Sequence, residues 1–212
     1  MRRIVRVGGS LAAWFPPTQS AQSDRGTSLA ELVLALGIVL GLIGLLTPVT
    51  ASAIDSGRAR QAAGFVAARL RHARQQAVTR SASTGLVFDL SGSRWTFRVC
   101  VDGDANGVRR TDLRAGKDSC VEGPVDLAVL FPGIDVGVDD TIRGPDGEAP
   151  SSDPVRFGAS NLASFSPTGG CTPGSLFVRS AKGVQYAVRV AGVTGRTRVL
   201  RYDRATRTWK DA

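Results

Sequence analysis

The apolar stretch that follows Gly26 constrains this chain more than any other part of the sequence. From Leu29 to Val49 it contains about 21 residues, enough for a helix to cross roughly 30 Å of hydrocarbon. Its one charged side chain is Glu31, near the start. A carboxylate at that depth is costly and usually requires a partner. The sequence therefore predicts a membrane-spanning helix that carries a domain outside the membrane.

The residues around this stretch have the register of a known processing signal. A cut after Gly26 would make Glu31 the fifth residue of the mature chain and Pro48 the twenty-second. This pattern resembles the amino terminus of type IV pilins and pseudopilins, which a prepilin peptidase cuts after a glycine and then N-methylates. The resemblance implies a leader peptide over residues 1–26, processing at Gly26 and Thr27, and filament assembly through Glu31 and Pro48. Thr27 departs from the family, which usually has Phe or Met there.

Two other interpretations of the amino terminus are an ordinary signal anchor and a cleaved secretory signal peptide. The second needs a small-x-small site after the apolar run, and Ala51-Ser52-Ala53 would serve. Neither interpretation requires the spacing of glycine, glutamate and proline, so we favour the pilin pattern.

Charge predicts the orientation in the membrane. The net charge of the chain is +9, and the leader contains four arginines and one aspartate, so its removal would leave +6. Positive charge before an apolar run stays in the cytoplasm, which places everything after Val49 outside it. We therefore expect a single-pass protein of the cell inner membrane with its C-terminal domain in the periplasm.

Helical signals continue beyond Pro48. Small and apolar residues recur at helical spacing at Ala62, Val66, Leu70, Ala73 and Ala77, and Phe65 and Val78 widen this stripe. The pattern predicts one helix over residues 27–83, bent or locally melted at Pro48 because proline lacks the N–H that a helix interior uses. Residues 27–49 form its transmembrane half and residues 50–83 its amphipathic half.

Strand signals dominate residues 84–212, the predicted β-rich domain. Residues 86–99 have the pattern of a hairpin, 102–118 and 141–153 that of loops, and 125–138 that of a strand broken by Pro132-Gly133. The alternating side chains of residues 184–191 predict a half-buried strand. Residues 196–202 are predicted to run back beside it, and residues 203–209 to form another short strand that reverses direction again.

Three short motifs in this later half resemble the GspH/FimT branch of the pilin family. They are Leu70–Ala77 at the helix end, Phe165–Gly169 before a strand, and Gly195–Arg198. The resemblance implies the fold class α+β, with a long N-terminal spine helix packed on an antiparallel β-sheet domain, as in pilins.

The cysteines and one acidic loop are candidate structural sites. Cys100 and Cys120 flank the loop 102–118, so we expect them to form a disulfide in the oxidising periplasm and to leave Cys171 free. Within the loop, oxygen ligands alternate as in the first half of a calcium loop, although the acid expected at the twelfth position comes one residue early. The candidate calcium ligands are Asp102, Asp104, Asn106 and Asp112; the alternative is an ordinary turn with no cofactor.

The carboxyl-terminal residues are strongly basic. From Arg179 onward there are nine lysines and arginines and only two aspartates. Spaced arginines grip phosphates through charge-assisted hydrogen bonds, and in the FimT branch a similar Gly-Arg-x-Arg tail is implicated in binding DNA. The candidate DNA-binding residues are Arg196, Arg198 and Arg201. The alternative is a solvated basic edge strand that discourages aggregation.

Enzyme classes find no support, since the sequence lacks a Gly-x-Ser-x-Gly motif, a paired-histidine metal motif and a phosphate loop. We expect a minor pilin or pseudopilin that assembles with other pilins or pseudopilins in a type II secretion or type IV pilus filament. The alternative is a DNA-binding minor pilin that acts in DNA uptake during natural transformation.

Overall fold

Helix α1 (Leu29–Arg80) opens the computed structural model, which describes residues 28–212 apart from the side chains of residues 45–49. The helix begins and ends within a few residues of its predicted bounds, and its backbone stays helical through Pro48. The chain divides into two compact units, residues 1–44 and 45–212.

The described part of the first unit is an apolar helical segment with exposed side chains. Ten large apolar side chains between Leu29 and Ile43 are each at least half exposed. They include consecutive runs, so they point in all directions around the helix. Among the described residues, no helix combines the length and the apolar character that crossing a membrane requires.

In the second unit α1 buries a stripe of small side chains. Ala62, Val66, Leu70, Ala73 and Ala77 are all fully buried, as their spacing predicted, and Ala59, Ala63 and Ala67 are buried with them. Val78 was expected on this stripe but is 54 % exposed. Alanines bring the helix backbone close to the sheets, and Ser180 at the end of a strand fixes it further by donating a 2.5 Å hydrogen bond to Asp55.

One sheet contains four antiparallel strands in the order β3-β2-β1-β6. They are β1 (Thr84–Ser91), β2 (Arg94–Val101), β3 (Ser119–Asp126) and β6 (Leu162–Phe165). The hairpin β1–β2 pairs without interruption from Thr84↔Val101 to Ser91↔Arg94, as its alternating pattern predicted. Between β2 and β3 lies α2 (Arg110–Ala115), a short helix where the sequence indicated only a loop.

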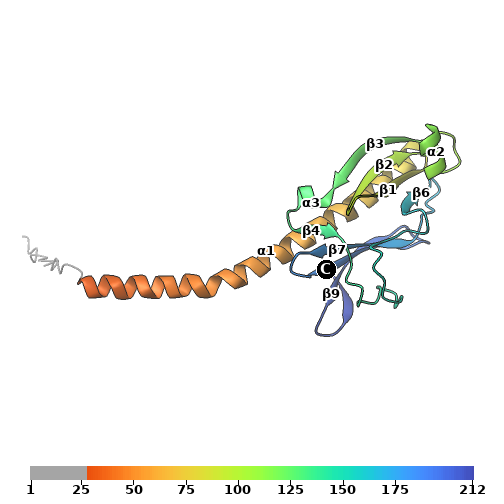
Figure 1. Cartoon of the computed structure of the whole chain (residues 1–212). Helices are drawn as coiled ribbons and strands as arrows, with labels where there is room; N and C mark the ends of the chain where they lie inside the picture. Colours follow the sequence, from red (N-terminus) through yellow and green to blue (C-terminus); the bar gives the residue numbers. More distant parts are fainter. Residues whose placement is uncertain (1–27) are drawn as a thin grey trace, which may run out of the picture. The chain divides into compact units, whose positions relative to one another are not determined.

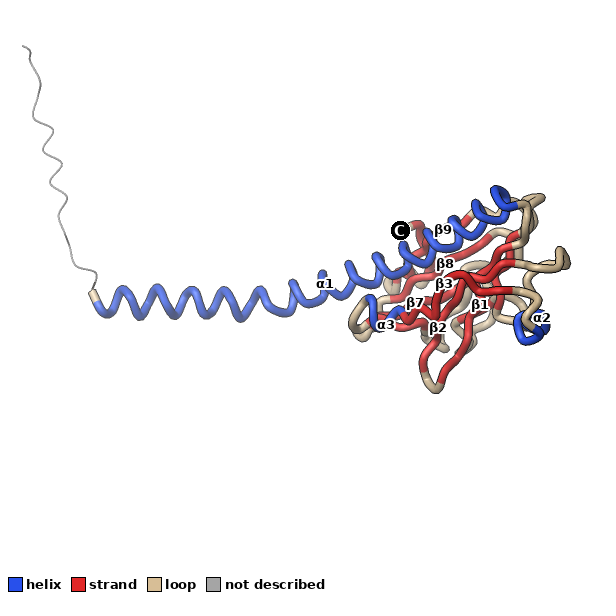
Figure 2. Tube along the Cα trace, turned by 90° about the horizontal axis from the view of Figure 1, so that it is seen from above, coloured by secondary structure: helices blue, strands red, loops and turns tan. Residues whose placement is uncertain are grey.

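The second sheet follows the order β10-β9-β8-β7-β4, with β5 also paired to β7. Its strands are β4 (Ile134–Val136), β5 (Val155–Arg156), β7 (Gly174–Ser180), β8 (Gln185–Val190), β9 (Thr197–Asp203) and β10 (Thr208–Asp211). Figures 1 and 2 show the later part of α1 running along both sheets. The main core therefore contains apolar side chains from α1 and from the facing side of each sheet.

The predicted strand over 125–138 is wrong in its middle. Leu127–Leu130 forms a helical turn, α3, because the Asp126 carboxylate accepts a 2.8 Å hydrogen bond from the backbone N–H of Ala128 and caps it. Strand β4 then follows Pro132-Gly133.

Strand β8 was predicted to be half buried, but both of its faces are covered. Tyr186 and Val188 lie in the main core, while Ala187 packs with Phe177 and Leu200 under Trp209 on the other face. The buried Gln185 satisfies its amide by donating to the carbonyls of Gly137 and Val178 at 2.8 and 3.0 Å. The alternation along the strand did not predict this second covered face, because segments distant in the sequence cover it.

Candidate functional site

The processing site falls outside the residues that the structure describes, since Gly26 and Thr27 lie in residues 1–27. Glu31 lies in the exposed first turn of α1, where its backbone N–H donates to the Ser28 carbonyl at 2.9 Å. A carboxylate there is favoured by the positive end of the helix dipole. Pro48 lies inside the same helix.

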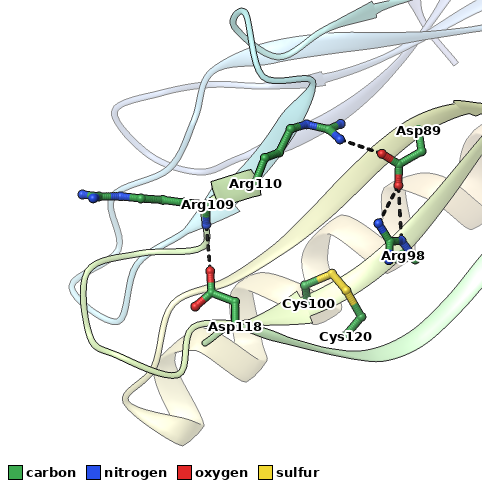
Figure 3. Close-up of a disulfide and its surroundings, with 7 residues drawn as sticks. All are labelled: Asp89, Arg98, Cys100, Arg109, Arg110, Asp118 and Cys120. Carbon is green, nitrogen blue, oxygen red and sulfur yellow. Dashed lines mark hydrogen bonds and ion pairs between the residues drawn. A yellow bond between two sulfur atoms is a disulfide. The ribbon is translucent and has the colours of Figure 1, made fainter. Parts of the chain in front are cut away.

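A disulfide closes the segment between β2 and β3. Cys100 and Cys120 face each other directly across the two strands and are bonded, the pairing that their flanking positions indicated (Figure 3). Cys171 is a free, half-buried thiol. The enclosed segment covers the outer face of the first sheet, where Val108 and Leu113 pack on Val87.

Two buried carboxylates organise the backbone of this segment. Asp102 accepts hydrogen bonds from the backbone N–H groups of Asp104 and Gly107, at 3.1 and 2.7 Å. Asp118 accepts from Gly103 with one oxygen and from Arg109 with the other, at 3.1 and 2.9 Å. Partial burial raises the pKa of Asp102, but these backbone N–H groups outweigh it and hold the pKa below the usual value.

The predicted calcium ligands are only partly brought together. The carboxylate oxygens of Asp102 and Asp104 lie within 4.8 Å of one from Asp118, which the sequence analysis did not select. Asp112 is not part of this group, because it lies in the first turn of α2. The position of Asp118 two residues before a disulfide cysteine was the only signal for it. Most of the oxygens in the group already accept backbone N–H groups, and these hydrogen bonds stabilise the turn.

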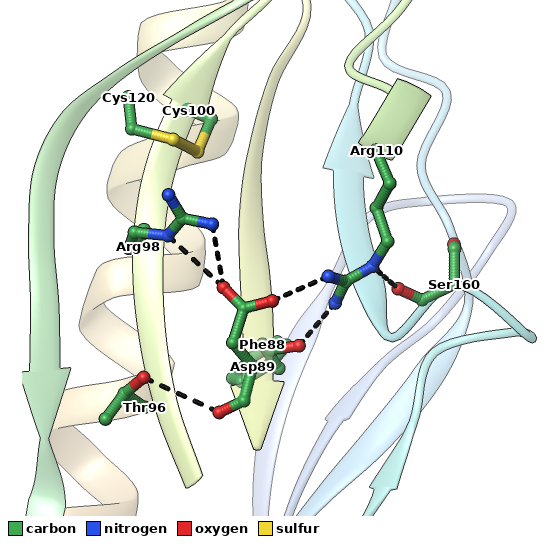
Figure 4. Close-up of polar contacts among 8 residues, drawn as sticks. All are labelled: Phe88, Asp89, Thr96, Arg98, Cys100, Arg110, Cys120 and Ser160. Atoms are coloured by element: carbon green, nitrogen blue, oxygen red, sulfur yellow. Dashed lines mark hydrogen bonds and ion pairs between the residues drawn. A yellow bond between two sulfur atoms is a disulfide. The ribbon is translucent and has the colours of Figure 1, made fainter. Parts of the chain in front are cut away.

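An ion-pair network ties α2 to the sheet beneath it (Figure 4). One oxygen of Asp89 accepts from Arg110 at 2.6 Å, and the other accepts from Arg98 at 2.8 and 3.2 Å. Arg110 also donates to the carbonyls of Ser160, at 2.5 Å, and Phe88. Burial of Asp89 raises its pKa, but the two guanidinium groups more than offset this and hold the pKa below its usual range.

Three arginines line one cavity of about 280 Å³ on the outer face of the second sheet: Arg189, Arg196 and Arg198. Arg198 forms a two-point ion pair with Asp211, at 2.5 and 3.2 Å. Arg189 pairs with Asp146 and, at 3.9 Å, with Glu148, both on the loop 141–153. Sequence analysis did not single out Arg189, although alternation along β8 places it on this face.

Arg201 lies on the other face of β9, so the predicted trio of Arg196, Arg198 and Arg201 does not form one site. Residues three apart on a strand point to opposite faces, and Arg201 accordingly lines a different cavity, with Lys182 and Lys210. The basic tail therefore presents two separate positive surfaces.

A long helix with an alanine-rich stripe, packed on two antiparallel sheets, defines an α+β protein of the pilin-like class. Ion pairs and a disulfide hold the surface segments of this domain in place. A family model described as "Type II transport protein GspH" matches residues 62–195, well over half of the chain. The chain belongs to the GspH family. No curated protein and no solved structure matches it.

Membership assigns the chain to the pseudopilins of type II secretion, a family of structural proteins. It also implies assembly with other pseudopilins in a filament. The match confirms the GspH/FimT resemblance that the three short motifs indicated.

Proposed function

We propose that this protein is a minor pseudopilin that is processed by the prepilin peptidase and held in a type II secretion or type IV pilus filament through the amino-terminal part of α1. The observation that carries the proposal is the apolar surface of Leu29–Ile43, which is exposed on every side of the helix. A helix that is apolar all round requires cover from lipid or from neighbouring helices. Both are available to a subunit that moves from the inner membrane into a filament.

Glu31 supports the same function. In a bundle of such helices its carboxylate can pair with the α-amine of Thr27 of a neighbouring subunit, which cleavage after Gly26 would expose. Two charges that are each expensive in an apolar setting become tolerable as a pair, and the pairing sets the register between subunits. The membrane placement, with the second unit in the periplasm, is part of this proposal.

Processing is tested by co-expression with a prepilin peptidase. The mature chain should begin at Thr27, with an N-methylated terminus, and Gly26→Ala should leave the chain at full length. Mass spectrometry of the intact protein gives both results. An amino terminus near Ala53 or Ile54 would instead identify a secretory signal peptide and contradict the proposal.

Assembly is tested with Glu31→Gln, which keeps the side-chain shape and removes the charge. The variant should be cleaved normally but should be lost from sheared filament fractions, because the pairing with the neighbouring amine is missing. Asp55→Asn serves as the control for loss of one α1 carboxylate. If Glu31→Gln enters filaments as efficiently as the native chain, the pairing is wrong.

DNA binding is a second candidate function, supported by the cavity that Arg189, Arg196 and Arg198 share. Arginines on phosphates carry no base information, so binding to duplex should not depend on sequence and should weaken steeply with salt. A fragment from residue 51 onward keeps every buried core residue and suits the test. Arg196→Gln/Arg198→Gln should reduce the salt slope by about one to two units. If Arg58→Gln/Arg60→Gln on α1 weakens DNA binding equally, the effect comes from net charge alone.

A further inference from the structure

A second cavity of about 540 Å³ opens on the face of β9 that carries Arg201. The turn between β7 and β8 borders it on one side and the hairpin β9–β10 on the other. Four cationic residues contribute to its lining: Lys182, Arg201, Arg204 and Lys210. The cavity is concave and lies away from the Arg196–Arg198 face, so the proposed DNA surface does not account for it.

Two of these four cations have no counter-ion in the part of the chain that the structure describes. Within residues 28–212, Lys182 and Arg201 are exposed and take part in no ion pair or side-chain hydrogen bond. Lys210, by contrast, pairs with Asp203 at 2.5 Å. That contact, first among several hydrogen bonds, lowers the pKa of Asp203 to about 2. The cavity therefore holds positive charge in excess of what its own carboxylates neutralise.

Arg204 is held in position at the rim. Its guanidinium donates to the carbonyl of Gly183 at 3.0 Å. A side chain at Gly183 would meet that guanidinium at 2.8 Å, and the positive φ of 79° at this residue also favours glycine. The glycine thus lets the arginine reach over the turn, where its guanidinium also forms an ion pair with Asp139 at 3.7 Å.

We propose that this cavity binds a phosphate group, with Arg201 and Lys182 as its principal ligands and Arg204 at its rim. A guanidinium fork matches two oxygens of a tetrahedral anion, and a lysine adds a point charge. The cavity is large enough for a phosphate ester and is enclosed on two sides, which suits a compact headgroup. The phosphate belongs either to an anionic lipid headgroup or to a free phosphate, and both place the same chemistry on the same side chains.

Titration of the full chain in micelles of an uncharged detergent tests the site. The probes are inorganic phosphate, short-chain phosphatidylglycerol below its micelle concentration, and short-chain phosphatidylcholine as the zwitterionic comparison, each followed by calorimetry. Saturation by phosphatidylglycerol alone identifies a lipid headgroup, and saturation by inorganic phosphate identifies the free anion. Absence of saturable binding by both up to about 10 mM would overturn the proposal.

Variants separate this site from general attraction by a basic protein. Arg201→Gln and Lys182→Gln should each weaken binding about ten-fold, because each removes a charged contact to the phosphate. Arg207→Gln is the matched control, since Arg207 lies in the turn of the same hairpin but does not line the cavity. Equal weakening by Arg207→Gln would overturn the site. Unchanged thermal midpoints for all three variants establish that the fold is intact.

Discussion

Arg189 and Arg198 stand directly opposite each other on the neighbouring strands β8 and β9. Like charges at paired positions destabilise a sheet, and the protein offsets them with carboxylates from two distant segments. Asp146 comes from the loop after β4, and Asp211 comes from the last strand. Trp209 holds the same loop by donating to the carbonyl of Arg143 at 2.8 Å. The arginine surface that would meet DNA is thus partly covered by the acidic groups of its own chain.

If this surface binds DNA, Asp211 competes with the phosphate for Arg198. Asp211→Asn should therefore raise the affinity for duplex several-fold, because the guanidinium no longer exchanges one anion for another. Fluorescence anisotropy with a labelled duplex at fixed salt measures the change. Asp140→Asn removes one negative charge from an exposed position outside this cavity. Equal gains from both variants would show a net-charge effect.

Asp89 is the centre of the ion-pair network under α2, and its replacement should destabilise the domain. Asp89→Asn leaves Arg98 and Arg110 without their shared counter-ion. Since all three side chains are about one-third exposed, solvent screens the contacts, and we expect a loss of about 1–2 kcal/mol in the free energy of unfolding at neutral pH. Urea unfolding measures it. A loss as large from Asp153→Asn would show that the network has no special role.

Asp89 should also make the free energy of unfolding depend on pH, in a direction that its pKa defines. Because the folded-state pKa of Asp89 lies below the usual value of 3.8, the unfolded chain binds its proton first as the pH falls. The stabilisation is therefore complete above that value and is lost below it. The difference in unfolding free energy between the native chain and Asp89→Asn should shrink from about pH 7 to about pH 2.5. A constant difference would contradict the assignment.

The disulfide between Cys100 and Cys120 should contribute measurably to stability. It closes a loop with a sequence separation of 20, which corresponds to about 3 kcal/mol in the chain-entropy description. The double variant Cys100→Ser/Cys120→Ser should show this loss in urea unfolding. Peptide mapping of the native chain without reduction should recover the linked pair. Cys171→Ser is the control, because a hydroxyl can keep the 3.2 Å contacts of that thiol with the carbonyls of Ala191 and Gly192.

Much of the fold was predictable because local patterns determine it. The stripe from Ala62 to Ala77 has the helical period, and β1 and β2 alternate on either side of a Ser-Gly-Ser turn. The helical turn at Leu127 was missed because short apolar runs suit both helix and strand. Asp126, a helix-capping residue directly before it, was the available signal.

The sites were less predictable because they depend on tertiary contacts. Asp118 joins Asp102 only when the disulfide register sets the two strands side by side. Arg201 was grouped with Arg196 and Arg198 by nearness in sequence, while the pleat of β9 separates it from them. No local sequence pattern predicts that Asp211 forms an ion pair with Arg198.

Replacing carboxylates in the disulfide-closed segment tests whether it is a turn or a calcium site. Both oxygens of Asp118 accept backbone N–H groups, whereas one oxygen of Asp112 is buried and has no hydrogen-bond partner within the described residues. Asp118→Asn should therefore destabilise the domain by about 1–2 kcal/mol, while Asp112→Asn should be nearly neutral. We expect no rise in the thermal midpoint with millimolar Ca²⁺, since backbone N–H groups already offset much of the negative charge of Asp102 and Asp118. A rise with Ca²⁺ that Asp118→Asn abolishes would contradict the turn and establish a calcium site there.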